Sequence, residues 1–456
     1  MISLNINLKA KIGLLMLFVL MVIPSTFASG NYDYRLGDVN QDGKISVSDV
    51  VYLFNNRNLD IEDADVNADN KISVSDVVYL FNYYDDMSNS ITHSLNMNLK
   101  YYDASGYEVN PYNGESYEYK ILTDSTGKKI LLKHTDQVDP TGDNWGSKYD
   151  ISVDIPLTKV LVMSSTQIAL MNPLNNDGSV FNSIKGISYG GGYTWYYPEI
   201  ESGLTSGTIV DLGSSGAPTE DKIVALSDSQ LSFVYPDPWS NNAFSTACDK
   251  AGVLPVSDAE YLEQTFLGRC EWVKMFAAFY DKENLASKYF NEEEKKALNV
   301  KRITQTADTT PLVAWGSSSS WGTYVPKSQS YIVKGLVQDC NTQYTFLDQT
   351  GTGSASIEYE TFFDRNKNAD IWVISSSLGY IGDFKTQYTG YAEYKSYQNG
   401  KIFCFSDDFY QTGLEKTSKV LEDMAIITHP ELYPGKTTKY LLHFDPEAGT
   451  ATPYTA

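Results

Sequence analysis

The sequence predicts an α/β protein with two lobes, preceded by a small helical module. Three observations lead to this prediction. The stretch KISVSDVVYLFN occurs twice, at residues 44–55 and 71–82. Short apolar strands alternate with helical or loop stretches in two separate parts of the chain, which is the α/β pattern. A segment with apolar residues at helical spacing, residues 258–298, lies between those two parts.

The N-terminus has the pattern of a secretory signal peptide. Lys9 and Lys11 precede an apolar run, IGLLMLFVLMVIP. In the following STFASG, Thr26 and Ala28 occupy the small-residue positions of a cleavage site. We therefore expect residues 1–28 to be removed and the protein to be extracellular or at the cell surface. An uncleaved membrane anchor is the alternative, which the short apolar run disfavours. No Cys follows the run, so we do not expect a lipid-modified N-terminus.

The repeat has the spacing of a calcium-binding loop. Its copies begin at an acid, as DVNQDGKISVSD at residues 38–49 and DVNADNKISVSD at residues 65–76. Acids or amides fall at loop positions 1, 3, 5 and 12, which suits the hard oxygen ligands of Ca²⁺. Asn70 stands where the first loop has Gly43, and Asn tolerates the left-handed conformation, so we expect both sites to bind. The predicted ligands, with the lysines contributing backbone carbonyls, are Asp38, Asn40, Asp42, Lys44, Ser46 and Asp49, and Asp65, Asn67, Asp69, Lys71, Ser73 and Asp76.

Each loop runs into the amphipathic segment SDVVYLFN without a clear helix before it. On these motifs, residues 36–86 resemble a dockerin, the duplicated calcium-binding module that docks into a cohesin receptor. The resemblance implies that Val47–Ser48 and Val74–Ser75 help to select the partner, and that the two copies form equivalent docking faces. We therefore expect a dockerin over residues 29–90 that binds a cohesin-bearing surface protein and carries the remaining chain as its cargo.

The cargo begins with β-hairpins and continues as two α/β halves. The hairpins are predicted over residues 95–134, where apolar and polar positions alternate between turn signals. The strands of the first half are KVLVMSS, LSFVY and GVLPV, and those of the second are PLVAW, DIWVISS and KIFCFS. The predicted segments are a linker and β-hairpin (91–116), lobe 1 (117–257), a linking helix (258–298) and lobe 2 (299–456).

This arrangement resembles the substrate-binding proteins of ABC importers for iron–siderophore, haem and cobalamin-type ligands. The resemblance extends from Lys120 to Pro434. Its phrases, in order, are ILTDSTGKKILL, KVLVMSS, YYPEI, VDLGSSGAPTEDKIVAL, LGRCEWVKMFAAFYDKE, SQSYIVKGLVQDC, ETFFDRNKNADIWVI and MAIITHPELYP. It implies a protein that binds its ligand between two lobes, is not an enzyme, and docks onto a membrane permease through one acid on each lobe. By position these acids are Asp221, with Glu220 as its neighbour and alternative, and Glu360. An acid that only stabilises a helix N-terminus is the other interpretation.

Aromatic residues in glycine- or serine-rich loops are the candidate ligand contacts, because flexible loops at strand ends carry binding residues. The loop AWGSSSSWGTY is the strongest candidate, and packing in the core is the alternative for each residue. The predicted ligand-binding residues are Tyr193, Trp195, Trp239, Trp315, Trp321, Tyr324 and Tyr380.

Composition excludes other classes of partner and ligand. The formal net charge of −22 argues against nucleic acid and anionic membranes. Only four His are present, at positions 93, 134, 429 and 443, and they form no cluster for a bare metal ion. We therefore expect a metal that arrives inside its own chelate, such as an iron chelate or a corrinoid.

Two rival functions remain open. A dockerin-bearing polysaccharide-degrading enzyme would need paired carboxylates at strand ends, and the acids of DAEYLEQ and YETFFDRN have the pattern of helix surfaces. A surface adhesion or structural protein is the other rival.

The four cysteines also leave two alternatives. Two disulfides, Cys248–Cys270 and Cys340–Cys404, are compatible with export, and so are four buried free thiols.

Overall fold

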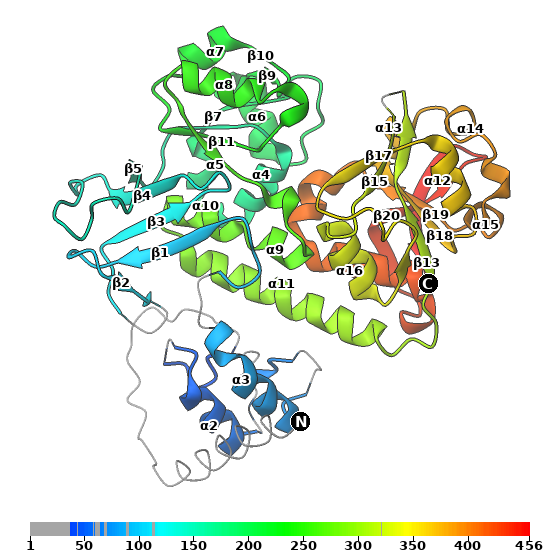
Figure 1. The fold of residues 1–456 in the computed structure, drawn as a ribbon, viewed down its shortest axis with the longest axis horizontal. Coiled ribbons are helices and arrows are strands. Elements are labelled where there is room, and N and C mark those ends of the chain that lie inside the picture. Colours follow the sequence, from blue (N-terminus) through cyan, green and yellow to red (C-terminus); the bar gives the residue numbers. More distant parts are fainter. Residues whose placement is uncertain are drawn as a thin grey trace.

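The computed structural model shows a small helical module and two α/β lobes that lie above one long helix (Figure 1). The structure describes residues 37–42, 44–57, 59, 64–67, 71–87, 91–111, 115–320 and 322–456, with the side chains of residues 83–87 left out. The predicted signal peptide lies outside the described residues. Among the described helices, none combines the length and apolar character that a membrane span needs.

The helical module consists of α2 (Val47–Asn55) and α3 (Val74–Met87), which begin at the same place in each copy of the repeat. Ser46 caps α2 with a capping box, in which its hydroxyl and the Asp49 carboxylate satisfy free backbone N–H groups. The module has its own small core, with equivalent positions from both copies on its inner side. This core contains Val39, Ile45, Val50, Leu53, Ala64, Val66, Val77 and Leu80.

The predicted hairpins belong to a five-stranded sheet with the order β2-β1-β3-β4-β5. Because β1 pairs with β3, the predicted boundary between residues 116 and 117 falls inside this sheet. The buried Lys120 ties the sheet to the helices beneath it, since its ammonium is 2.5 Å from Glu283 and 2.6 Å from Asp281. The strands are β1 (Asn98–Tyr102), β2 (Glu108–Val109), β3 (Tyr119–Thr123), β4 (Lys129–His134) and β5 (Ile151–Ile155).

Lobe 1 is built on a parallel five-stranded sheet with the order β12-β11-β6-β7-β8. Its central strands are fully buried apolar runs, as expected for a parallel sheet covered by helices. The strands are β6 (Val160–Val162), β7 (Ile184–Ile187), β8 (Val210–Asp211), β11 (Leu231–Val234) and β12 (Leu254–Ser257). The helices include α4 (Ser165–Met171), α6 (Pro198–Ser206), α7 (Glu220–Ala225) and α8 (Ala243–Lys250).

The sequence predicts one linking helix over residues 258–298. The segment that joins the lobes instead contains three α-helices. They are α9 (Phe266–Cys270), α10 (Val273–Tyr280) and α11 (Glu283–Thr304). The chain breaks after α10 because Asp281 adopts a left-handed conformation, with φ at 53°. Only α11, with 22 residues, is long enough to pass beneath both lobes (Figure 1). Periodicity predicted the helical character but not this break.

Lobe 2 has a mixed six-stranded sheet with the order β16-β13-β18-β19-β20-β21, in which the last two strands run antiparallel. A three-stranded sheet, β14-β15-β17, lies beside it. The strands are β13 (Leu312–Trp315), β14 (Ser317–Ser319), β15 (Gly322–Pro326), β16 (Gln343–Tyr344), β17 (Ser354–Ile357), β18 (Ile371–Ser377), β19 (Ile402–Phe405), β20 (Thr437–Asp445) and β21 (Thr450–Thr455). The main helices are α12 (Tyr359–Asn366), α13 (Leu378–Ile381) and α16 (Thr417–Thr428), with a π-helical turn, η9 (Phe409–Gly413).

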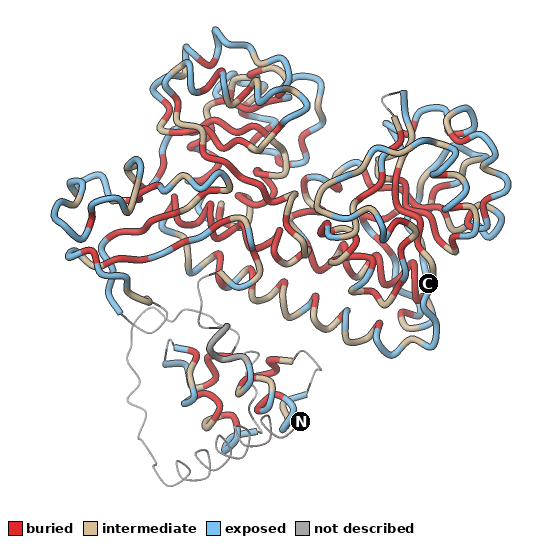
Figure 2. The backbone as a smooth tube through the Cα atoms, viewed as in Figure 1, coloured by how far each residue is buried: buried red, intermediate tan, exposed pale blue. Residues whose placement is uncertain are grey.

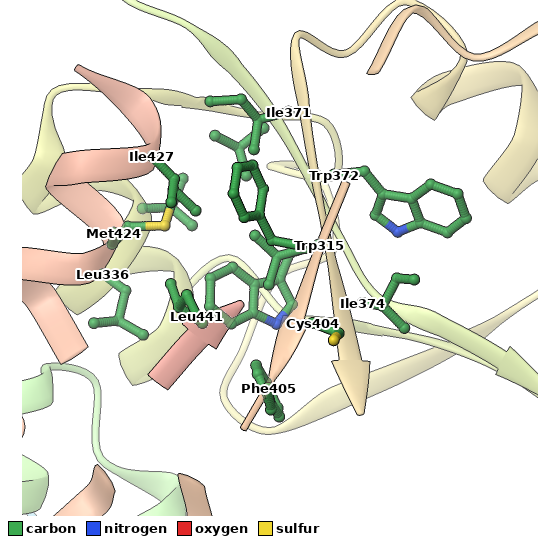
Figure 3. Packing of buried hydrophobic residues seen from close by; sticks show 14 of the residues in the cluster. Trp315, Leu336, Ile371, Trp372, Ile374, Cys404, Phe405, Met424, Ile427 and Leu441 are labelled. Atoms are coloured by element: carbon green, nitrogen blue, oxygen red, sulfur yellow. The ribbon is translucent and has the colours of Figure 1, made fainter. Parts of the chain in front are cut away.

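Each lobe has a separate core along its sheet, as the buried backbone in Figure 2 shows. The core of lobe 2 packs aromatic rings against aliphatic side chains of α16 and η6 (Val333–Val337) (Figure 3). Trp315 and Trp372, both without solvent exposure, lie near its centre. The predicted strands of both halves are confirmed at β6, β11, β12, β13, β18 and β19.

A short segment before β1, residues 92–96, is held on the joining helices by two buried carboxylates; we call it the strap. Glu271 accepts hydrogen bonds from the backbone N–H groups of residues 92, 93 and 94, at 2.7–2.8 Å. Glu263 accepts two more, from the N–H groups of residues 95 and 96. The strap lies so close to α9 that a Cβ at Gly268 would meet the His93 carbonyl oxygen at 2.9 Å. The chain from the helical module is therefore fixed where the lobes join.

Candidate interlobe binding cleft

A cavity of about 370 Å³ opens at the carboxyl edge of the lobe 1 sheet. Residues 163–166 follow β6, residues 188–189 follow β7, and Tyr235 follows β11. Ligands of open α/β sheets bind at this edge. Two residues of lobe 2, Tyr380 and Tyr410, close the opposite side of the cavity. The complete lining is Met163, Ser164, Ser165, Thr166, Ser188, Tyr189, Tyr193, Trp195, Tyr235, Tyr380 and Tyr410.

A second cavity of about 270 Å³ lies at the corresponding edge of the lobe 2 sheet. Tyr410 lines both cavities, so they adjoin between the lobes, and we call the two together the cleft. The lining of this part is Tyr261, Ser317, Tyr324, Val325, Pro326, Ser330, Tyr331, Ile332, Gly353, Ser354, Ser375, Phe405 and Tyr410.

The lining of the cleft is aromatic and hydroxylated. Among the described residues that line either cavity there is no Asp, Glu, Lys, Arg or His. Burial raises the pKa of Tyr261 and of Tyr331 to about 12, so both phenols are neutral at physiological pH. The Tyr261 hydroxyl already donates to the Pro236 carbonyl at 2.6 Å. Tyr193 and Trp195 meet edge to face, with ring centroids 5.2 Å apart. The cleft offers flat apolar surfaces and hydroxyl groups to a ligand, but no formal charge.

A buried ionic cluster lies behind this lining. The Arg269 Nε is 2.5 Å from a carboxylate oxygen of Glu260, and both side chains are at most 5% exposed. The Arg269 guanidinium also lies 5.6 Å from the ring centroid of Tyr331. Burial and the neighbouring Glu260 raise the pKa of Asp258, the third member of the cluster. The positive charge of Arg269 is thus paired with Glu260 inside the protein, where it acts on the hydroxyls of Tyr331 and Tyr410 from behind the lining.

The two lobes are held together next to the cleft by η9. The buried Gln411 accepts a hydrogen bond from the N–H of Tyr196 at 2.9 Å and donates one to the carbonyl of Thr194 at 2.8 Å. Farther along, the Glu415 carboxylate accepts hydrogen bonds from Asn172 at 2.9 Å and from Tyr197 at 3.2 Å. These contacts join the loop that carries Tyr193 and Trp195 to the segment that carries Tyr410.

The predicted ligand-binding residues are divided between the cleft and other places. Tyr193, Trp195 and Tyr380 line the first cavity, and Tyr324 lines the second. Trp321 lies outside the described residues. The other two predicted residues do not line either cavity.

Trp315 is fully buried because it ends the inner strand β13, where its ring packs near Phe405 (Figure 3). Trp239 is 75% exposed in a short 3₁₀ turn. The composition of a loop does not show whether a residue lies at the end of a strand or at the tip of a loop. Trp315 lies at a strand end and is buried, whereas Trp239 lies in a surface turn and is exposed.

Sequence reasoning missed several tyrosines of the cleft: Tyr189, Tyr235, Tyr261, Tyr331 and Tyr410. A usable signal exists for Tyr189 and Tyr235, which each stand within two residues of the carboxyl end of a parallel strand. The position of Tyr410 depends on the π-helical turn that carries it, for which the sequence has no clear mark.

The predicted permease-docking acids lie on short helices at the outer surface of each lobe. Asp221 and its neighbour Glu220 are exposed in the first turn of α7, and Glu360 is exposed in the first turn of α12. Glu220 is 3.8 Å from Lys250. In Figure 1, α7 lies at the top of lobe 1 and α12 in the upper part of lobe 2, both away from α11.

The first predicted calcium loop brings its carboxylates together. Oxygens of Asp38, Asp42 and Asp49 lie within 4.8 Å of one another, a spacing that one cation could bridge. Asp49 also accepts hydrogen bonds from the N–H groups of Asn40 at 3.2 Å and Ser46 at 2.9 Å, which fix the loop around it. Hard, closely spaced oxygens of this kind fit Ca²⁺.

The second loop repeats the hydrogen bonds of the first. Asp76 accepts from the N–H groups of Asn67 at 3.3 Å and Ser73 at 2.8 Å. Asp65 and Asp76 are buried, as are Asp38 and Asp49 in the first loop. Asp69 and Asn70 lie outside the described residues. The residues at positions 10 and 11 of both loops are exposed at the helix starts.

The four cysteines are free and buried. The disulfides Cys248–Cys270 and Cys340–Cys404 are therefore not formed. Cys248 and Cys270 lie in different clusters, because Cys248 is on the buried side of α8 and Cys270 ends α9. Of the two alternatives, the structure has the four buried thiols.

Comparison with known proteins identifies the fold and family. A protein family described as "Periplasmic binding protein" matches residues 250–408 of the chain. An uncharacterized lipoprotein of Methanocaldococcus jannaschii is 46% identical over 373 residues, which cover 81% of this chain and 89% of that protein. A second uncharacterized protein of that organism is 25% identical over 293 residues, or 63% of this chain and 86% of its own length.

Solved structures also resemble the chain. A protein of an ABC-type Fe³⁺-hydroxamate transport system from Saccharomonospora viridis aligns over 62% of this chain and 97% of its own, with 14% identity and a TM-score of 0.49. A periplasmic haem-binding protein from Pseudomonas aeruginosa aligns over 66% and 98%, with 11% identity and a TM-score of 0.47.

Two α/β lobes with a cleft between their sheet edges are the architecture expected of a solute-binding protein. Given the extent of identity with the M. jannaschii lipoprotein and the matching family description, the chain belongs to the periplasmic binding protein family.

Proposed function

We propose that the protein is a surface-attached solute-binding protein of an ABC importer, and that it captures a chelated metal such as an iron–siderophore, haem or a cobalamin-like compound. The observation that carries this proposal is the cleft whose walls come from both lobes and meet at Tyr410. The described lining offers no His, Cys or carboxylate ligand, so a metal would have to arrive with its coordination sphere already filled.

A permease contact through the two lobes is part of this proposal. Asp221, or its neighbour Glu220, and Glu360 would pair with basic residues of the permease. Their exposure at helix starts on both lobes leaves them accessible to a partner. Their contribution would be electrostatic, so it should weaken at high salt.

We further propose that the N-terminal module is a dockerin that attaches the protein to a cohesin-bearing surface protein. Two Ca²⁺ ions would order its loops. Val47 and Val74, 43% and 49% exposed at the same position of each copy, would be equivalent parts of its two docking faces.

The ligand is tested by purifying the protein from its own organism and measuring its absorbance spectrum and native mass. The purified protein is then offered ferric siderophores, haem and corrinoids. We expect a bound chromophore of defined mass, released on denaturation. A protein that carries no ligand and takes none from the panel would contradict the importer function and favour an adhesive role.

The attachment is tested on intact cells with a calcium chelator. We expect chelation to release the protein, and added Ca²⁺ to restore binding to a cohesin surface. D49A combined with D76A should bind neither Ca²⁺ nor cohesin, whereas D143N, at an exposed acid of the hairpin sheet, should bind both. Retention on cells after complete chelation would contradict this mode of attachment.

A further inference from the structure

The charge of the cleft bears on which chelates it can accept, and this inference rests on the proposed function. The residues that face the ligand space from both lobes contribute phenols, hydroxyls, an indole and apolar side chains, and none of the described lining residues carries a formal charge. A ligand with an uncompensated negative charge would lose its hydration on entering and would find only neutral donors in return.

The ionised groups behind the lining do not change this balance in favour of anions. Arg269 is the cation of the buried cluster, and Glu260 is already paired with it at 2.5 Å. Tyr331 separates the guanidinium from the cleft, since it lines the cavity and lies against Arg269 on its other side. Around the same wall, Glu260 and Asp237 are close enough to act on Tyr261, whereas burial and Glu260 raise the pKa of Asp258 and favour its neutral form. The local surroundings therefore oppose an anion, as does the net charge of −22.

The shape and chemistry of the walls favour a neutral ligand with flat or amide-rich faces. Tyr193 and Trp195 form one wall, and Tyr410 and the exposed Tyr380 form the facing wall from the other lobe. Aromatic faces contact apolar and amide surfaces, and the hydroxyls of Ser164 and Ser165 after β6 can bond to carbonyl or hydroxyl groups. The Ser188 hydroxyl already donates to the Gly213 carbonyl at 2.8 Å.

We infer that the cleft selects metal chelates without net negative charge. Ferric tris-hydroxamates and neutral corrinoids belong to this class. Trianionic ferric tris-catecholates, ferric citrate and haem, with its two propionates, do not. The discrimination arises from the uncharged lining and the pairing of Arg269 inside the protein, rather than from the size of the cleft.

The inference is tested with the full mature protein and chelates of known charge. A neutral ferric tris-hydroxamate, a ferric tris-catecholate of similar size, cyanocobalamin and haem are titrated separately, with binding followed by calorimetry. We expect at least one neutral chelate to bind about 100-fold more tightly than either anionic compound. The preference should become smaller at high salt, because charge repulsion is screened.

A variant that adds a positive charge to the cleft wall separates the effect of electrostatics from that of shape. Tyr380, which is 74% exposed on the lobe 2 wall, can accept a long polar side chain without disturbing a core. Y380R should improve binding of the tris-catecholate by about tenfold, whereas Y380Q, which removes the same ring from the wall without adding a charge, should not improve it.

The outcomes distinguish this inference from the proposed function. If the wild-type protein binds the tris-catecholate or haem as tightly as every neutral chelate, the charge selection is wrong and the importer function stands. If no chelate of either charge binds, the proposed function fails, and the inference fails with it.

Discussion

The Gln411 side chain of lobe 2 accepts a hydrogen bond from the backbone N–H of Tyr196 of lobe 1, with 2.9 Å between nitrogen and oxygen. The same amide donates to the Thr194 carbonyl at 2.8 Å, so one residue satisfies two backbone groups across the lobe boundary. Gln411 lies in a π-helical turn, a local irregularity often found at functional sites. Its neighbour Tyr410 lines both parts of the cleft, which places the interlobe contact and the ligand wall on the same turn.

Replacing Gln411 should loosen the lobes at the cleft. Q411A leaves the N–H of Tyr196 and the carbonyl of Thr194 without their partner, at a cost of about 1–2 kcal/mol in the free energy of unfolding. Hydrogen exchange of the Tyr196 amide should accelerate more than exchange in either sheet. Q398A, which removes an exposed glutamine bonded to one carbonyl, is the control. Equal exchange at Tyr196 in both variants would contradict a role in joining the lobes.

The strap should make stability depend on pH through Glu271. Burial by itself would raise the pKa of Glu271, but Lys274, His93 and hydrogen bonds that include the Ser94 N–H lower it to about 2. A carboxyl whose pKa is lower in the folded state stabilises the fold above its unfolded pKa of about 4.5, and this stabilisation is lost as the pH falls towards 2. The shift corresponds to about 3 kcal/mol.

E271Q should therefore be about 3 kcal/mol less stable than the wild type at pH 7. The difference between the two proteins should narrow steadily below about pH 4.5, because the wild-type carboxyl becomes protonated as well. Urea unfolding over a pH series measures it, with the exposed E393Q as the control. A difference that stays constant down to the acid limit of folding would show that charge on Glu271 is not its cause.

Two tryptophans from the same predicted set should contribute very differently to the stability of the fold. W315A creates a cavity in the centre of lobe 2, where the side chain has no exposure, and should cost about 3–5 kcal/mol. W239A removes a ring that is 75% exposed and should change the stability by less than about 0.5 kcal/mol. Chemical denaturation of both variants is the measurement. Similar losses in both would mean that Trp239 packs against a surface absent from the described chain.

The thiols should be unreactive until the protein unfolds. Burial raises the pKa of Cys248 to about 11 and that of Cys270 to about 12, and the reactive species is the thiolate. We expect no rapid reaction of the native protein with a thiol reagent, and reaction of four thiols in denaturant without reductant. Fewer than four thiols in denaturant would show that a disulfide forms after all.

The local order of the chain is determined by the sequence. Short, mostly apolar runs such as those of β11 and β19 indicate buried strands. Acids and amides at fixed spacing, beginning at Asp38 and Asp65, define both loops before any contact is known. The six named strands and the starts of α2 and α3 follow from these short-range patterns, because side-chain periodicity depends only on the backbone repeat.

The cleft was decided by the tertiary structure. Tyr193 and Tyr410 are more than 200 positions apart and meet only because α9, α10 and α11 set the lobes at one angle. Trp315 and Tyr324 come from one serine-rich stretch, yet one is in the core and the other at the cleft, since a strand ends between them. Likewise, only the folded chain shows that Glu260 neutralises Arg269. Long-range packing determines which aromatic rings remain accessible and which charges are paired. Neither property can be predicted from the local spacing of residues in the sequence.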